Sequence, residues 1–146
     1  MSGPLKISSP VDGETYSRIT QFYAHQMQLL DERAAEEWAD GFTEDGVFAQ
    51  NVKPEPWTGR AVIAERMRAG MDRLAKKDVQ RRHWFGMVAT ERQDAGTVLT
   101  RYYAMVFETP RGGRAATYLS TTGEDVLVLQ DGQWRVKHRL ITHDGT

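Results

Sequence analysis

The sequence predicts an α+β fold in which amino-terminal helices pack on one face of a curved, mainly antiparallel sheet. Large apolar residues recur at helical spacing over residues 19–30, whereas the chain from residue 83 onward is rich in β-branched and aromatic residues. Short turn sequences separate the later runs, which is typical of strands joined as an antiparallel meander. The helices are therefore expected first in the chain and the sheet last.

Three helices are expected in the first half of the chain. Asp12 is a candidate N-cap for the first helix, which runs to about Leu30. A short second helix is expected over residues 31–39, closed by Gly41, and a third from Arg60 to about Leu74. Residues 47–50 form an expected first strand, and the prolines that follow predict a loop or a sheet edge.

The second half of the chain predicts four strands, over residues 83–92, 97–109, 115–129 and 133–142. Turn signals lie between them at residues 94–96, 110–113 and 131–132. Gly123, inside the third of these strands, is a candidate bulge that would curve the sheet.

Length and composition describe one ordinary domain. The chain has 146 residues, a formal charge of -1 and 40% hydrophobic residues, which argues against a basic nucleic-acid-binding protein and a disordered acidic tail. The first residues lack the apolar core of a signal peptide, and no run reaches the length of a membrane span. We therefore expect a flexible arm over residues 1–11, a single domain over residues 12–146, and no nucleic-acid or membrane partner.

The chain contains no cysteine. This excludes disulfide bonds, a thiolate nucleophile and cysteine-ligated metals, and it fits a reducing cytoplasm. The four histidines are scattered, and the common nucleotide-binding, nucleophile-elbow and zinc-protease motifs are all missing from the sequence. We expect a cytoplasmic protein that uses no metal and no cofactor.

A two-residue turn at residues 94–95 would set the pairing of the first two long strands. It places residues 83, 85 and 87 opposite residues 106, 104 and 102, and moving the turn by one residue leaves the faces unchanged. One face is then mostly apolar, with one imidazole and one phenol: His83, Phe85, Met87, Tyr102, Ala104 and Val106. The opposite face is too apolar for contact with water, so we expect a homodimer formed through it: Trp84, Val88, Arg101, Tyr103, Met105 and Phe107.

Asp31 and His83 are the main candidate catalytic residues. Asp31 directly follows the apolar stripe of the first helix, and a carboxylate carried toward the interior there needs a partner. The best candidate partner is His83, at the start of a strand. The alternative is structural, with Asp31 capping the second helix and His83 bonded to backbone.

An imidazole paired with a carboxylate can move a proton. Fixed in one tautomer, it takes a proton from a carbon next to a carbonyl or opposite a leaving group. A phenol, Tyr102 or Tyr23, could donate a hydrogen bond to the oxygen on which charge develops. Phe85 and Met87 provide apolar walls that suit a hydrophobic ring substrate.

Four further residues complete the predicted substrate-binding set: Phe22, Met27, Trp57 and His138. His138 falls on the apolar side of the last strand, where it either faces the pocket or is satisfied in the core. Of the remaining histidines, His25 is expected at the boundary of its helix stripe and His143 is expected to be exposed.

Basic residues are concentrated between residues 60 and 82, where the chain contains eight basic and three acidic residues. The simpler interpretation is a solvated helix face and the loop after it. The alternative is a docking patch for an acidic partner, such as a carrier protein, or for a substrate that carries phosphate or carboxylate.

Several stretches resemble SnoaL-like proteins of the nuclear transport factor 2-like superfamily, with scytalone dehydratase and lindane dehydrochlorinase as the nearest chemical comparisons. They are Phe22–Tyr23, Leu29–Asp31, Trp38–Phe48 and Arg82–Trp84, and the similarity extends from about Glu14 to Thr142. The resemblance implies a cone-shaped α+β barrel, a dimer formed through the sheet, and catalytic roles for Asp31 and His83. It also places Tyr23 near the catalytic tyrosine of some dehydratase relatives.

Together, these features predict a cofactor-independent lyase or isomerase. We expect a dehydratase, double-bond isomerase or cyclase that acts on a hydrophobic cyclic, polyketide-like metabolite through an Asp-His general base. Two alternatives of the same fold stay open: a non-catalytic small-molecule-binding protein and an oxygenase β-subunit-like partner.

Overall fold

The computed structural model describes residues 3–146. Within them three helices and six strands follow one another, and the α+β class predicted from the sequence is confirmed. In chain order they are α1 (Gly13–Asp31), α2 (Ala35–Ala39), β1 (Phe42–Gln50), β2 (Trp57–Thr58), α3 (Arg60–Ala75), β3 (Val79–Asp94), β4 (Thr97–Pro110), β5 (Ala116–Gln130) and β6 (Gln133–His143).

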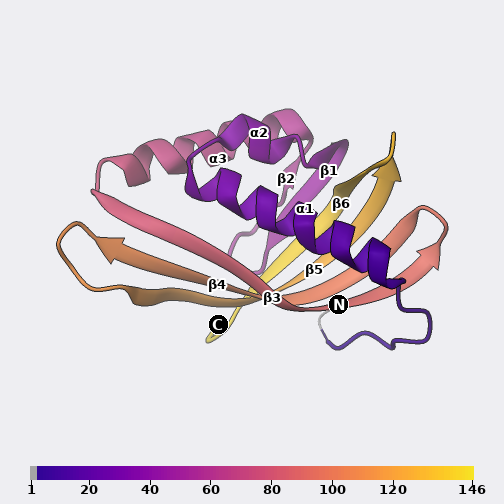
Figure 1. Cartoon of the computed structure of the whole chain (residues 1–146). Helices are drawn as coiled ribbons and strands as arrows, with labels where there is room; N and C mark the ends of the chain where they lie inside the picture. The colour runs from indigo at the N-terminus through magenta and orange to yellow at the C-terminus, as the bar shows by residue number, and fades with distance from the viewer. Residues whose placement is uncertain (1–2) are drawn as a thin grey trace.

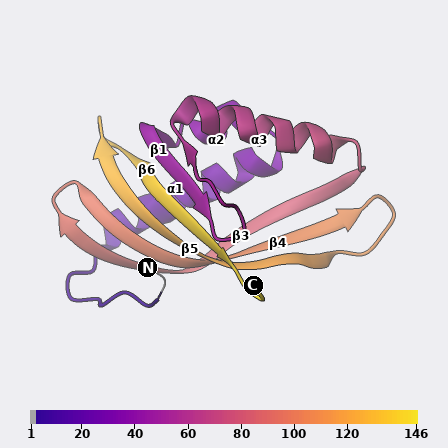
Figure 2. The same ribbon diagram turned by 180° about the vertical axis from the view of Figure 1, so that it is seen from behind.

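The strands form one curved sheet in the order β2-β1-β6-β5-β4-β3. Neighbours run antiparallel except β1 and β6, which are parallel. Figures 1 and 2 show the three helices gathered on one face of this sheet, which bends around them. The arrangement is the cone-shaped α+β barrel that the resemblance implied.

Helix α1 begins as the sequence predicts. The Asp12 side chain accepts a hydrogen bond of 2.9 Å from the Thr15 backbone nitrogen and so satisfies one of the free N–H groups of the first turn. Ile19, Tyr23 and Met27 are buried on the inner side of the helix. The apolar stripe therefore fixes α1 against the sheet and determines which way its last residues point.

The pairing of β3 with β4 places His83 opposite Val106 and Phe85 opposite Ala104, as predicted. The turn itself is shifted by one residue, because Asp94 pairs with Thr97. Two irregularities, one between residues 92 and 94 and one between residues 86 and 89, compensate for the shift before the chain reaches His83.

The prediction for Met87 is wrong. The bulge between Gly86 and Ala89 gives Met87 a positive φ of 50° and turns its side chain outward, where it is 74% exposed. Val88, expected on the outer face, packs against the core instead. The bulge therefore exchanges the faces of Met87 and Val88. At the bulge, the Tyr16 hydroxyl donates a hydrogen bond of 2.8 Å to the Val88 carbonyl.

A second bulge overturns the prediction for His138. Val126 pairs with His138 and Leu127 with Val136, so Lys137 is an extra residue in β6. From that point the alternation reverses, and His138 is exposed while Arg139 is buried. His138 therefore belongs neither to the pocket nor to the core.

Gly123 is not a bulge, since it pairs in regular register with Tyr102 and Ile141. A Cβ atom at this position would lie 2.1 Å from Cε1 of Tyr102. The missing side chain makes room for the Tyr102 ring, and this close approach is what requires glycine here.

The segment before α1 is fastened to the sheet edge. Backbone nitrogens of Ser8 and Ser9 donate to the Glu91 carboxylate at 3.0 and 2.9 Å, and the Arg92 nitrogen donates to the Ser9 carbonyl. The arm was predicted over residues 1–11, of which residues 1 and 2 lie outside the described part of the chain.

The outer face of the sheet carries exposed aromatic residues, as the predicted face assignment requires. Trp84 is 50% exposed, Tyr103 47% and Phe107 37%. The homodimer that would cover them stays a prediction. None of the helices within residues 3–146 is long and apolar enough to cross a membrane.

Candidate active site

A cavity of about 560 Å³ lies between the helices and the inner face of the sheet. Its walls include apolar side chains from α1, α2, α3 and five strands: Met27, Leu30, Trp38, Phe48, Met67, Phe85, Val106, Leu119 and Ile141. Asp31 and His83 lie in the same lining. The volume falls in the range of pockets that take small organic ligands.

The end of α1 positions Asp31 at the cavity. Arg33 adopts a left-handed conformation with φ of 62°, its nitrogen donates to the Leu30 carbonyl, and the Ala34 nitrogen donates to the Leu29 carbonyl. This pair of hydrogen bonds is the Schellman pattern that stops a helix. Asp31 is consequently the last residue of α1, and the α2 N-cap is Ala34, which makes no side-chain capping bond.

Asp31 and His83 are in direct contact. His83 Nδ1 lies 2.7 Å from Asp31 Oδ1, and the His83 backbone nitrogen donates to both carboxylate oxygens at 3.1 and 3.2 Å. β3 is the edge strand, so its outward N–H at His83 needs an acceptor beyond the sheet, and Asp31 provides it. The structural alternative, a cap on the second helix, is therefore wrong, although the catalytic role of the pair stays a prediction.

An ionised carboxylate only accepts hydrogen bonds. A neutral imidazole that donates from Nδ1 to the Asp31 carboxylate has its lone pair on Nε2. The Asp31 side chain is 8% exposed and that of His83 22%. The pair is thus sheltered but reachable, which a general base requires.

Tyr23 and Tyr102 point their hydroxyls at a buried acid that the sequence interpretation missed. Tyr23 donates to Asp125 Oδ2 at 2.7 Å and Tyr102 donates to Asp125 Oδ1 at 3.0 Å, while the Thr100 hydroxyl lies 2.6 Å from Tyr23. Burial, with the added charge of Asp125, raises the pKa of both phenols well above the usual value. Neither phenol lines the large cavity.

Arg139 completes this network and does line the cavity. It is 1% exposed, with Nε and Nη2 each 3.0 Å from Asp125 and Nη2 also 2.9 Å from the Gln26 side-chain oxygen. The Asp125 charge overcomes the effect of burial and raises the pKa of Arg139, so the guanidinium stays protonated. Its Nη1 atom has no hydrogen-bond partner among residues 3–146.

The family model of the SnoaL-like domain matches residues 12–140 of this chain. The chain belongs to the SnoaL-like family. Its fold and its resemblance to the nuclear transport factor 2-like superfamily agree with that assignment, and the family prediction made from the sequence is confirmed. No curated protein matches this SnoaL-like chain significantly.

Three solved structures are similar over nearly the whole SnoaL-like chain. Aln2 from a Streptomyces species is 33% identical, covering 93% of this chain and 95% of its own, with a TM-score of 0.86. ActVI-ORFA from Streptomyces coelicolor is 30% identical, covering 91% and 99%, with a TM-score of 0.83. A protein from Catenulispora acidiphila in complex with S-DNPA is 34% identical, covering 91% and 96%, with a TM-score of 0.81.

His143 also lines the cavity, together with His83. From the sequence it is expected to be exposed, and that expectation is wrong. It is half-buried, and its Nε2 lies 2.9 Å from the Gln50 side-chain oxygen. Burial lowers the pKa of His143; Asp144 opposes the shift and Lys53 adds to it. The β6 bulge explains the position, because it turns residues 139, 141 and 143 toward the interior.

The other predicted substrate-binding residues divide between the lining and the core. Met27 and Phe85 line the cavity, and their contact with a substrate stays a prediction. Phe22 and Trp57 pack against the core of the SnoaL-like domain and are not among the lining residues. His25 is exposed.

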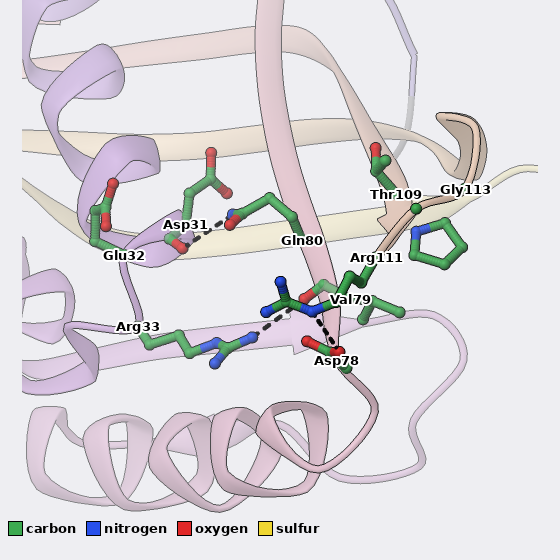
Figure 3. Close-up of a pocket in the computed structure, with 11 residues that line it drawn as sticks. Asp31, Glu32, Arg33, Asp78, Val79, Gln80, Thr109, Arg111 and Gly113 are labelled. Carbon is green, nitrogen blue, oxygen red and sulfur yellow. Dashed lines mark hydrogen bonds and ion pairs between the residues drawn. The ribbon is translucent and has the colours of Figure 1, made fainter.

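A second, more open groove of about 550 Å³ lies beside the cavity and shares Asp31, Arg33 and Gln80 with it. Figure 3 shows its polar walls, with Arg111 reaching Asp78 and Gln80 extending from β3 toward the backbone of Asp31. His83 does not line this groove, so the cavity that contains both Asp31 and His83 is the candidate active site. Within residues 3–146, no three metal-ligating His, Cys, Asp or Glu side chains come together.

Proposed function

We propose that this protein is a lyase or isomerase that removes a proton from a hydrophobic cyclic, polyketide-like metabolite, with His83 as the general base. The observation that carries the proposal is the 2.7 Å contact between His83 Nδ1 and Asp31 in the wall of the cavity. Asp31 orients the ring and stabilises the imidazolium that forms when Nε2 takes the proton.

The electron pair of the broken C–H bond determines the product. In a dehydration it forms a double bond as hydroxide leaves the neighbouring carbon, and the proton taken by His83 converts that hydroxide to water. In a double-bond shift the imidazolium returns the proton to a different carbon. Both reactions move protons and electron pairs within the substrate and need no external oxidant or reductant.

Arg139 is the best-placed group to stabilise negative charge on a substrate oxygen. It lines the cavity that His83 lines, it stays charged, and its Nη1 has no protein partner among residues 3–146. Trp38 offers a second donor in the lining, since its buried Nε1 also lacks a partner within that range. Donors fixed before the reaction stabilise a developing oxyanion at little reorganisation cost.

The two phenols are better suited to a supporting role. Their hydroxyls already donate hydrogen bonds to Asp125, and their raised pKa keeps them protonated as donors to that carboxylate. We infer that Tyr23 and Tyr102 hold the Asp125–Arg139 pair in place and act on the substrate only through it.

Apolar walls support a ring substrate. Phe85 lines the cavity, and its ring is held by stacking on Tyr102 with ring centroids 4.3 Å apart. The relative from Catenulispora acidiphila was solved in complex with S-DNPA. Membership of the SnoaL-like family is compatible with dehydration, isomerisation and cyclisation, so the reaction type within this class is part of the proposal.

The proposal is tested by incubating the purified protein with a panel of hydroxylated polycyclic ketones and analysing them by mass spectrometry. We expect a product that has lost one water or an isomer of unchanged mass. A ligand that binds and is recovered unaltered from the whole panel would instead support the binding-protein alternative. Isolation only in complex with a larger oxygenase subunit would support the oxygenase alternative.

Delivery of the substrate by an acidic carrier protein, a homodimeric assembly and a cytoplasmic location stay predictions. Arg81, in the basic segment behind the carrier-protein prediction, is bonded to Glu108 at 2.7 Å and lies over the Tyr118 ring. A carrier protein would therefore have to compete with an internal partner for this residue.

A further inference from the structure

The charged side chains that line the large cavity are mostly basic. Six are cationic and one, Asp31, is anionic, and the cations are Arg33, Lys53, Arg73, Lys77, Arg81 and Arg139. The whole chain has a net charge of -1, so this imbalance is local to the cavity. A cleft lined by one sign of charge concentrates ligands of the opposite sign.

Protein partners account for only part of this charge. Arg139 is paired with Asp125, Arg81 with Glu108, and Arg33 donates to the Val79 carbonyl at 3.1 Å. Asp31, the only acidic group in the lining, is engaged by His83. Three cations of the lining have no side-chain hydrogen bond or ion pair within residues 3–146: Lys53, Arg73 and Lys77.

These three unpaired cations lie where the cavity opens to solvent. Lys53, Arg73 and Lys77 are exposed, whereas the aromatic and aliphatic side chains of the lining are buried or half-buried, apart from Val52 and Tyr118. Lys53 comes from the loop between β1 and β2, and Arg73 and Lys77 come from the last turn of α3 and the residues after it. Two separate segments thus contribute exposed, unpaired positive charge to the lining of one cavity.

The basic residues of the segment seen in the sequence do not all have the same role. Arg60 donates to the Phe42 carbonyl and Arg68 pairs with Glu36, so these residues serve the fold. Arg73 and Lys77 have no such internal use and line the cavity. Arg66, Lys76 and Arg82 fit a solvated helix face and loop, because they are exposed and lie outside the cavity lining. That interpretation does not explain why Arg73 and Lys77 line the cavity together with Lys53.

We propose that the substrate is an anion, a cyclic molecule with an oxygen-based acidic group such as a carboxylate that Lys53, Arg73 and Lys77 hold at the opening. Its apolar ring system then enters the cavity and reaches His83. Ammonium and guanidinium groups bind carboxylate and similar oxyanions through charge-assisted hydrogen bonds. The inference rests on the proposed function, which places the substrate in the cavity at His83. It adds the chemical class of that substrate.

Two dyes of nearly the same apolar shape test the proposal directly. Anilinonaphthalene sulfonate carries an anionic group, and N-phenylnaphthylamine is its neutral counterpart. Fluorescence titration of the folded protein at low salt is expected to give an affinity at least about tenfold higher for the anionic dye. Raising the salt to about 1 M, where the screening length is about 3 Å, is expected to remove most of the difference.

Charge-neutral variants locate the effect. In the triple variant Lys53→Gln, Arg73→Gln and Lys77→Gln the preference for the anionic dye is expected to disappear while the neutral dye binds as before. The matched control removes the same charge from exposed positions outside the cavity lining, Arg66→Gln, Lys76→Gln and Lys137→Gln, and is expected to keep the preference. Circular dichroism of both variants verifies the fold.

Equal affinity for the two dyes, no binding of the anionic dye, or an equal loss of preference in both triple variants would overturn the proposal. Any of these results would leave the proposed chemistry at His83 standing, because neither dye is turned over. Conversely, a preference that depends on the three cations would survive even if His83 proved not to be a base. The two proposals can therefore fail separately.

Discussion

Arg139 and Asp125 form a salt bridge of 3.0 Å in which both side chains are almost inaccessible to solvent, with exposures of 1% and 0%. Two phenols and one amide also hydrogen-bond to the pair, through Tyr23, Tyr102 and Gln26, while Nη1 of Arg139 has no partner among residues 3–146. The pair connects β5 and β6 to α1 beneath the cavity. It keeps a cation at the cavity wall without leaving a buried charge unpaired.

Removing one partner of this pair is expected to destabilise the protein strongly. The variant Asp125→Asn leaves the buried Arg139 guanidinium without its counter-charge, and such losses typically cost about 3–5 kcal/mol. Urea denaturation followed by circular dichroism measures the change. Asp78→Asn, in the exposed pair with Arg111, is the matched control and should leave the midpoint unchanged. Equal midpoints for the two variants would show that the buried pair does not stabilise the fold.

Two of the five tyrosines should resist alkaline titration until the protein unfolds. Burial and Asp125 raise the pKa of Tyr23 and Tyr102, so the folded protein holds their protons at a pH where the unfolded chain releases them. Stability should accordingly fall as the pH rises above about 10. Absorbance of tyrosinate against pH is expected to show a late step that coincides with unfolding and shrinks in Tyr102→Phe. Complete titration in the folded state would contradict this expectation.

Alanine at Gly123 should destabilise the fold by overpacking. Its Cβ would lie within 2.1 Å of the Tyr102 ring, which is itself buried and bonded to Asp125. Such insertions typically cost about 1–3 kcal/mol. Gly96→Ala is the control, since nothing lies within 4 Å of the added atom there. A thermal midpoint for Gly123→Ala equal to that of the control would refute the packing role of the glycine.

His143 should make the protein more sensitive to mild acid. Burial lowers its pKa, with Asp144 opposing the shift and Lys53 adding to it, so the unfolded chain binds a proton more readily than the folded protein. Stability is then expected to fall as the pH drops below about 6.5 toward the lowered value. His143→Gln should reduce that slope in urea denaturation, whereas His25→Gln, at an exposed histidine, should not. Identical slopes for both variants would exclude His143 as the titrating group.

The parts of the site that depend on helix caps and on the spacing of apolar residues could be predicted from the sequence. The Asp12 cap and the apolar stripe determine where α1 begins and which face it buries, and they carry Asp31 inward. The pairing at His83 was also correct, although it depends on two irregularities in β3 that compensate for a shifted turn. Nothing in the local pattern indicates that compensation.

Two of the residues missing from the predicted site, Arg139 and His143, lie beyond the bulge in β6. An unbroken alternation along β6 favours His138 as the inward residue, but the extra residue Lys137 reverses the faces and brings Arg139 and His143 inside. One signal was present in the sequence. Asp125 shares its face of β5 with Leu127, and a carboxylate on a buried face requires a cation nearby. The buried carboxylate therefore predicts a buried cation on a neighbouring element, and Arg139 is that cation.

The most direct test of the proposed chemistry is the turnover of His83→Gln on a substrate that the wild-type protein converts, compared with His25→Gln at an exposed histidine. Loss of a general base is expected to lower kcat by about a hundredfold to ten-thousandfold, with the fold retained by circular dichroism and His25→Gln as active as the wild type. A His83→Gln variant that turns over substrate at the wild-type rate would contradict the assignment of His83 as the base.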